Sequence, residues 1–161
     1  MTLHSFGPLS PVAACWHVNA IAASLRSADA QELRSASGLG ADEALRRSVE
    51  GSDKLWLLWA GAKPVFVCGV AGLPTIPEVG IVWGVGANAI EHHPKAFTRA
   101  CMKITAEMHK TFPVLMNWVD ERNTVHVKWL EWMGYEMKES TNLFSKDGTS
   151  FRRFIRVAGH V

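Results

Sequence analysis

The feature that most constrains the fold is the stretch at residues 53–72, DKLWLLWAGAKPVFVCGVAG. Two apolar runs, rich in aromatic and β-branched residues, lie on either side of the short sequence Gly61-Ala62-Lys63-Pro64. Such runs around a glycine-containing turn predict a β-hairpin. The chain must therefore build an antiparallel pair of strands, and the other elements have to be arranged around it.

The segments after this hairpin predict a strand, a helix and another strand. Residues 80–87, GIVWGVGA, and 113–120, PVLMNWVD, have the apolar character of strands. Between them, Pro94 occupies the favoured first-turn position of a helix that runs to about Thr111. The residues expected on its buried face are Phe97, Cys101, Ile104 and Met108. A strand–helix–strand step predicts one parallel pair, joined by a right-handed crossover.

Shorter segments complete the predicted order. Residues 14–22 predict the first strand, 27–38 and 41–51 two helices, 73–80 a loop, and 135–158 a closing hairpin. Ser27 or Asp29 is expected to cap the first of these helices, and Gly38 to end it. The predicted class is α+β, with a mixed, mostly antiparallel sheet, one parallel pair and about four helices in a sandwich-like arrangement.

The composition indicates an ordinary globular domain. The chain has 161 residues, 48% apolar and 20% charged. We expect residues 1–13 to form an extended arm and residues 14–161 a single domain. A net charge of +2 does not favour a nucleic-acid partner. The chain has no apolar run long enough for a membrane span, and no basic segment precedes an apolar one as in a secretory signal peptide.

The cysteines and histidines do not form a metal-binding pattern. Cys15, Cys68 and Cys101 are far apart and include no CxxC pair, so neither a zinc site nor a disulfide framework is indicated. The seven histidines have no HxxH or HxxxH spacing. We therefore predict no metal site.

Residues 117–135, NWVDERNTVHVKWLEWMGY, combine a strand end, a charged corner and a short helix that closes on a glycine and an aromatic residue. Together with the order of elements, this stretch resembles the GCN5-related N-acetyltransferase (GNAT) fold. The matching residues are Asn117, Asp120, Asn123, Gly134 and Tyr135. The resemblance covers about Cys15 to Val157, although its motifs are short.

A closer resemblance is to small acetyltransferase-like proteins of short-tailed bacteriophages, of the internal virion protein A type. The matching pieces are GIVWGVG, NWVDERN and HVKWLEWMGY. This resemblance implies a virion-associated or accessory protein that works through contacts with other phage proteins or with itself and requires no cofactor. It would be found in the virion or in the host cytoplasm.

The alternative is an active acetyl-CoA-dependent N-acetyltransferase with a divergent cofactor loop. Such an enzyme binds pyrophosphate at a helix N-terminus, and its pantetheine arm needs a gap between two strands. The family's Arg/Gln-x-x-Gly-x-Gly/Ala loop is missing from GANAIEHHPKAF, where Glu91 adds negative charge and Pro94 removes an N–H donor. If coenzyme A binds, the implied contact residues are Trp83, Gly84, Val85, Gly86, Asn117 and Asn123.

Proton transfer would also lack its usual donor. Many family members have a tyrosine four residues before the glycine that ends the helix, and that position is Leu130 here. His92 and His93 are the remaining candidates for a general base. Because they precede Pro94, a capping or solvent-exposed role is the alternative for both.

Several residues have a structural and a functional interpretation. Asn123 is suited to cap the following helix. The spacing of Val125, Trp129 and Trp132 places them on one helix face, which predicts either core or a partner surface. Gly84 and Gly86 predict a bulge or a close backbone approach.

Two further sets of residues are candidate contacts with partners. Lys95, Arg99 and Lys103 form a basic stripe that is either solvated or contacts a phosphate or an acidic protein. Leu3, Phe6 and Leu9 of the arm are predicted to dock on another chain.

Overall fold

The computed structural model describes residues 3–92 and 94–159. Its strands are β1 (Leu3–Leu9), β2 (Lys54–Ala60), β3 (Lys63–Leu73), β4 (Ile76–Gly86), β5 (Val114–Asp120), β6 (Glu136–Thr141) and β7 (Phe151–Val157). Its helices are α1 (Pro11–Ala22), α2 (Ser27–Ser37), α3 (Ala41–Glu50), the 3₁₀ turn η1 (Asn88–His92), α4 (Pro94–His109) and α5 (Thr124–Trp132).

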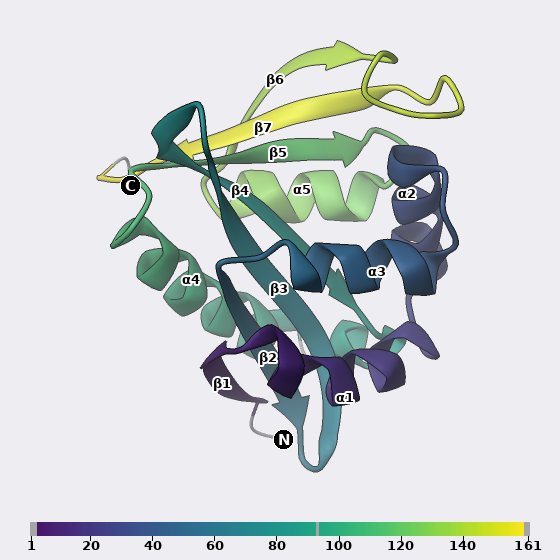
Figure 1. Cartoon of the computed structure of the whole chain (residues 1–161), viewed down its shortest axis with the longest axis vertical. Coiled ribbons are helices and arrows are strands. Elements are labelled where there is room, and N and C mark those ends of the chain that lie inside the picture. Colours follow the sequence, from purple (N-terminus) through teal and green to yellow (C-terminus); the bar gives the residue numbers. More distant parts are fainter. Residues whose placement is uncertain (1–2, 93, 160–161) are drawn as a thin grey trace.

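The seven strands of the described chain form one sheet in the order β1-β2-β3-β4-β5-β7-β6 (Figure 1). All neighbouring pairs are antiparallel except β4 and β5, which are parallel and are connected through α4. The predicted mixed sheet with one parallel pair is confirmed. The number of α-helices is five in the described residues, one more than predicted.

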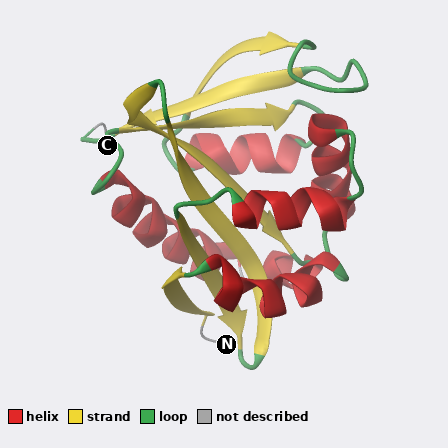
Figure 2. Cartoon of the chain, viewed as in Figure 1, coloured by secondary structure: helices red, strands yellow, loops and turns green. Residues whose placement is uncertain are grey.

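Helices cover both faces of the sheet, with α1, α2 and α3 on one side and α4 and α5 on the other (Figure 2). Alternate side chains of β2 pack into the helix layers on opposite faces of the sheet. Leu55 and Leu57 pack in the α1–α3 layer, whereas Trp56 and Leu58 pack in the α4–α5 layer. This double coverage explains why the hairpin strands are apolar almost throughout, because no face is left to water.

The predicted first strand at residues 14–22 is wrong, because these residues belong to α1. Ser10 caps this helix by accepting a hydrogen bond from Ala13 N over 3.3 Å, and Pro11 occupies its first position. An apolar run without clear periodicity does not distinguish helix from strand. The cap and the proline were therefore the decisive signals.

The first strand is instead β1, which pairs antiparallel with the edge of β2. The segment expected to be a separate arm is thus extended, but it contributes a strand to the same sheet. The expected boundary after residue 13 falls inside α1. Leu9 packs against the α1–α3 core. Docking of Leu3, Phe6 and Leu9 on another chain stays a prediction.

The long helix is confirmed as α4, with its expected face buried in full: Phe97, Cys101, Ile104 and Met108. The predicted loop at residues 73–80 is wrong beyond its first residues. Only Pro74 and Thr75 form the turn, and β4 begins at Ile76. No helix of the described residues is both long and apolar enough to cross a membrane.

Candidate functional site

The parallel strands β4 and β5 separate before they end. Their pairing stops at Ile81 and Met116. Strand β4 nevertheless continues to Gly86, and β5 continues to Asp120. A gap therefore opens between the C-terminal halves of the two strands, which is the kind of position where open α/β sheets place ligands.

Asn117 lies at the point where the strands separate. Its Nδ2 donates to the carbonyl oxygen of Val82 over 2.7 Å, and its Oδ1 accepts from Trp118 N over 2.8 Å. The amide side chain thus satisfies backbone groups that the interrupted ladder leaves free. Asn117 therefore stabilises the two strands where they separate, and it also lines the gap.

A cavity of about 260 Å³ occupies the gap and extends to both faces of the sheet. Its lining includes Leu33 and Ala44 on the α2–α3 side, Gly84 and Asn117 in the gap, and Ile104 and Leu130 on the α4–α5 side. A mostly apolar space with a few polar groups is the usual form of a small-molecule site. This cavity is the candidate functional site.

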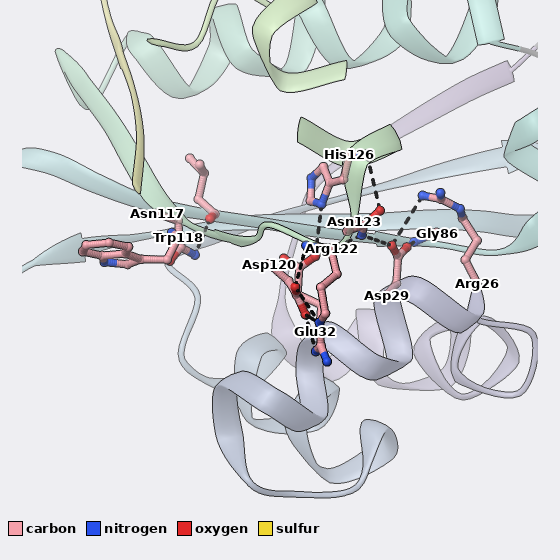
Figure 3. Close-up of polar contacts among 11 residues, drawn as sticks. Arg26, Asp29, Glu32, Gly86, Asn117, Trp118, Asp120, Arg122, Asn123 and His126 are labelled. Carbon is pink, nitrogen blue, oxygen red and sulfur yellow. Dashed lines mark hydrogen bonds and ion pairs between the residues drawn. The ribbon is translucent and has the colours of Figure 1, made fainter. Parts of the chain in front are cut away.

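Two carboxylates of α2 lie at the open end of the gap (Figure 3). Asp29 Oδ2 accepts a hydrogen bond from Gly86 N over 3.0 Å. Asn123 Nδ2 donates to Glu32 Oε2 over 3.0 Å, and His126 Nδ1 lies 3.4 Å from the same oxygen. Because Asn123 and His126 belong to the start of α5, these contacts tie α2 to the ends of both diverging strands.

Arg26 extends this network toward the start of α4. Its Nη1 lies 3.4 Å from Asp29 Oδ1, and its Nε donates to Glu91 Oε1 over 3.0 Å. One guanidinium is therefore shared between two carboxylates. The end of the gap carries three acids, Asp29, Glu32 and Glu91, matched by Arg26 and by the imidazole of His126.

The network changes the proton affinity of its members. Burial raises the pKa of Asp29, and His126, Gly86 and Arg26 offset only part of this effect. For His126, burial is the largest effect and lowers its pKa, but the charge and hydrogen bond of Glu32, together with Asp29, outweigh it, so that the pKa is raised. The folded protein therefore favours a protonated His126 beside Glu32.

We expect the stability of the protein to fall as the pH rises above about 6.5, the unperturbed pKa of histidine. The raised pKa of His126 contributes stability that is complete below this value and is lost as the pH passes the higher folded value. Urea unfolding at several pH values from 6 to 9 measures this slope. The His126→Gln variant should have a flatter profile over this range.

His109 supplies the matched control. Burial, its largest effect, lowers the pKa of His109. Its contribution is therefore present above the ordinary histidine value and is lost as the pH falls, so His109→Gln should leave the slope above pH 6.5 unchanged. An unchanged slope in His126→Gln would show that the Glu32–His126 pair does not act in this way.

Asn123 is confirmed as the N-cap of α5, since its side chain accepts from His126 N over 3.4 Å. It is also buried, and its Nδ2 donates to Glu32 while its Oδ1 caps the helix. We expect Asn123→Ala to lower the unfolding free energy by about 2 kcal/mol, since it removes a cap and a buried donor. Asn123→Ser keeps the cap and should lose about 1 kcal/mol.

Chemical denaturation of both variants measures this difference. Equal losses for alanine and serine would mean that the donor to Glu32 carries the whole effect and that the cap carries none. No loss in either variant would show that Asn123 has no structural role.

A second, smaller cavity connects the gap with the start of α4. It is lined by Gly84 on β4, Pro94 and Phe97 on α4, and Val125 and Trp129 on α5. The rings of Phe97 and Trp129 stack with centroids 5.3 Å apart and planes at 26°. Large aromatic side chains therefore form part of the wall of this cavity.

The face predicted for α5 is only partly correct. Trp129 is half-buried, whereas Val125 is 64% and Trp132 is 71% exposed. The helix packs on the sheet through Leu130 and Met133 instead, because both are almost fully buried. Trp129 reaches the core from the side that faces α4.

At the end of α5, Leu130 and Tyr135 both line the cavity, and only Tyr135 carries a proton that could be transferred. Leu130 is buried among apolar side chains. The ring of Tyr135 packs edge-on against Phe154, and burial raises the pKa of Tyr135 to about 12 despite a hydrogen bond with Thr105. Burial also raises the pKa of the Cys68 and Cys101 thiols. Tyr135, Cys68 and Cys101 therefore stay protonated at physiological pH, and none of them is available as a base.

The structure brings some of the implied contact residues together. Trp83, Gly84, Val85 and Asn117 all line the first cavity, whereas Gly86 and Asn123 belong to the network at its end. Trp83 also donates to Ser52 Oγ over 2.8 Å. Their role in binding coenzyme A stays a prediction.

The predicted bulge at the two glycines of β4 is absent, since β3 and β4 keep their register there. The close approach is confirmed. A Cβ at Gly84 would lie 2.6 Å from Phe66 Cζ, and one at Gly86 would lie 2.5 Å from Ile90 Cδ1. A side chain at Gly84 would collide with the Phe66 ring and approach Cys68 Cβ, whereas one at Gly86 would require the end of the Ile90 side chain to move.

The candidate histidines do not reach the cavities. His92 is exposed at the end of η1 and lines neither of them. His93 lies outside the described residues. Their role as general base stays a prediction, and the geometry favours His126 over His92.

Sequence reasoning missed Asp29, Glu32 and His126. Asp29 was interpreted as a helix cap, but Arg26 occupies the cap position and no side chain caps α2. The available signal was the charge pattern: two acids, Asp29 and Glu32, three residues apart on one short helix. Only the tertiary structure shows that they face the start of α5.

The β6–β7 loop covers the cavity on the α2 side. Phe144 stacks on Trp118 with centroids 5.7 Å apart, and it lines the cavity. Ser35 of α2 donates to Asp147 Oδ2 over 2.7 Å, and Lys146 N donates to the carbonyl oxygen of Ser35. Hydrogen bonds from Thr149 and Ser35 lower the pKa of Asp147 to about 2. The loop is therefore fastened to α2.

Neither a protein-family model nor a curated protein matches this chain. Among solved structures, it is similar to a GNAT-family acetyltransferase from Streptococcus pneumoniae (TM-score 0.64, 12% identity, covering 98% of this chain and 99% of that one). It is also similar to an acetyltransferase from Thermus thermophilus (TM-score 0.66, 14% identity, 98% and 97%).

A third similar structure is RimL, a ribosomal L7/L12 α-N-protein acetyltransferase in complex with coenzyme A (TM-score 0.64, 9% identity, 98% and 94%). At these identities the likeness establishes the fold, and the fold is that of the GNAT acetyltransferases. Within the described residues, no group of three or more histidine, cysteine or acidic side chains is arranged to hold a metal ion.

Proposed function

We propose that this chain is a bacteriophage accessory or virion-associated protein that uses an acetyltransferase-like fold for binding and does not transfer acetyl groups. The observation that carries the proposal is the stack of Trp129 on Phe97, which occupies part of the space between α4 and α5 and leaves only the small second cavity. The sequence resemblance to the small acetyltransferase-like proteins of short-tailed phages supports the phage setting. The partners would be other phage proteins or a second copy, in the virion or in the host cytoplasm.

The residues present do not fit coenzyme A. A path from the strand gap to the start of α4 would pass the second cavity, where Phe97 and Trp129 are stacked. At its end, Glu91 is 59% exposed beside the position where a pyrophosphate would need positive charge and N–H donors. Arg26, the cation that contacts Glu91, is already shared by Glu91 and Asp29.

The side chains available for proton transfer also argue against acetyl transfer. Acetyl transfer to an amine needs a group that takes up a proton and a group that reprotonates the leaving thiolate. Leu130 stands where the family resemblance expects a tyrosine, and the hydroxyl of Tyr135 is engaged with Thr105. Burial keeps the Cys68 and Cys101 thiols protonated, so neither can take up the proton of the amine.

An active acetyl-CoA-dependent N-acetyltransferase is the second candidate. The cavity that passes between β4 and β5 favours it, because acetyl donor and amine would have to meet there. His126, which lines this cavity, would be the proton acceptor. Its raised pKa weakens this role, since the protonated form accepts nothing.

An assay of product formation separates the two candidates. The purified protein is incubated with acetyl-CoA and a panel of amines, peptide N-termini and lysine peptides, and acetylated products and free coenzyme A are quantified by mass spectrometry. We expect no product above the enzyme-free background. Amine-dependent product that disappears in His126→Gln would establish the enzyme and contradict the proposal.

A further inference from the structure

Helix α5 exposes an apolar stripe that the described part of the chain does not cover. Trp132 is 71% exposed and Val125 is 64% exposed, and the half-buried Trp129 lies between them. Seven residues of helix separate the two ends, a length of about 10 Å or two turns. Single exposed apolar residues are ordinary, but a stripe that contains two tryptophans is typical of an interaction surface.

The stripe borders the first turns of α4. Pro94 and Thr98 of α4 line the second cavity together with Val125 and Trp129. On the solvent side of these turns, Lys95 and Arg99 are exposed. The apolar stripe of α5 therefore lies next to the basic stripe of α4.

The cations near the stripe are not neutralised by nearby acids. Among the described residues, no ion pair involves Lys95, Arg99, Lys103 or Lys128, and all four are exposed. Cations elsewhere, such as Arg46, Arg152 and Arg153, are paired with carboxylates. α4 and α5 contain one acid each, Glu107 and Glu131, and Glu107 is paired with Lys110.

We propose that this surface, formed by Val125, Trp129 and Trp132 with Lys95, Arg99 and Lys128, docks a protein helix with an apolar face and acidic flanks. The inference rests on the proposed function, since it names the surface and the partner chemistry for a protein that acts by binding. Trp132 would enter the partner's apolar face. The lysines and Arg99 would meet its carboxylates, which is the usual way in which an amphipathic helix is recognised.

Charge complementarity selects this occupant over two others. Nucleic acid would use the cations but not the exposed Val125 beside them, and the net charge of the whole chain is only +2. A second copy would need its own acidic amphipathic helix. The acid-rich α3 cannot serve, because its Leu45 and Val49 are fully buried and Glu43 is paired with Arg46 and Arg47.

The experiment uses three fluorescein-labelled helical peptides, each about four turns long, in buffer of about physiological ionic strength. The first has leucines at helical spacing and glutamates on both flanks, the second has lysines in place of the glutamates, and the third has serines in place of the leucines. Fluorescence anisotropy measures their affinities for the full chain. We expect binding of the first peptide alone.

Variants of the proposed surface test whether the peptide binds there. Trp132→Ala should weaken binding of the first peptide at least about tenfold, because tryptophans are the residues whose truncation most often costs this much at interfaces. The double variant Lys95→Glu/Arg99→Glu should weaken it by a similar factor. The matched controls are Leu143→Ala, at an apolar residue 90% exposed on the β6–β7 loop, and Arg34→Glu, at an exposed cation of α2 on the opposite face. Both should bind normally.

Four results would overturn the proposal. They are no binding of the first peptide at high micromolar protein, equal binding of the lysine peptide, unchanged binding by Trp132→Ala, and self-association in sedimentation that Trp132→Ala abolishes. A parallel titration with acetyl-CoA keeps the two proposals apart. Binding of acetyl-CoA beside normal peptide binding contradicts the proposed function and leaves the docking surface standing.

Discussion

Phe151→Ala is expected to lower the free energy of unfolding by about 3–5 kcal/mol, the usual loss for truncation of a buried phenylalanine. Phe151 is fully buried at the start of β7, opposite Asp120 of β5. Its ring lies 5.1 Å from that of Phe144, the loop residue that covers the cavity. Truncation would enlarge an existing cavity, and neighbouring side chains could fill little of the added space.

The control is Leu143→Ala, one residue before Phe144 in the same loop. Leu143 is 90% exposed, and its truncation should change stability by less than about 0.5 kcal/mol. Urea unfolding of both variants gives the comparison. A loss for Phe151→Ala below about 1 kcal/mol, well short of the usual range, would mean that the loop and β7 do not close the cavity as described.

Leu130→Ala is expected to cost about 3 kcal/mol, because Leu130 is a core residue of the α4–α5 layer and is only 3% exposed. This expectation differs from that for a residue that reacts with a ligand, whose truncation would reduce binding and leave the fold intact. Leu130→Met keeps the volume and should cost less than about 1.5 kcal/mol.

Thermal and chemical denaturation of the two variants decide between these roles. If Leu130→Ala is as stable as the intact protein, the packing of α5 on the sheet has been assigned to the wrong residues. The same result would make a functional role for Leu130 possible again.

The sequence predicted the central elements well because their signals are local. The turn at Gly61-Ala62 between two apolar runs defined the β2–β3 hairpin, and Pro94 with the i, i+4, i+7 spacing from Phe97 to Ile104 defined α4. The parallel pair followed from the crossover rule, since a single helix connects β4 and β5. These features depend on neighbouring residues only.

The errors in the predicted elements arose where tertiary contacts determine the structure. The apolar segment of α1 has no periodic signal that separates helix from strand, and its cap at Ser10 was overlooked. The buried face of α5 was expected to include Val125 and Trp132, but Leu130 is the residue that packs on the sheet. Helical spacing identifies a common face, but not which of two apolar faces is covered.

The candidate site could be predicted only in outline. Asn117 and Gly84 were located in the gap from the family resemblance, and the structure places both in the cavity lining. The network of Asp29, Glu32 and His126 joins α2 to α5, with 94 positions between Glu32 and His126 in the chain. No local pattern specifies such a contact, because it exists only once α2 and α5 have packed around the strand ends.

Isothermal titration calorimetry with acetyl-CoA tests the central claim most directly. With Trp129 stacked on Phe97 and acids at the end of the gap, we predict no measurable heat at millimolar cofactor for the intact protein. The injected acetyl-CoA is checked against a separate coenzyme A-binding protein in the same buffer. Binding in the micromolar range with a stoichiometry near one would contradict the account, because it would show that the chain accommodates the cofactor despite the Phe97–Trp129 stack and the acids at the end of the gap.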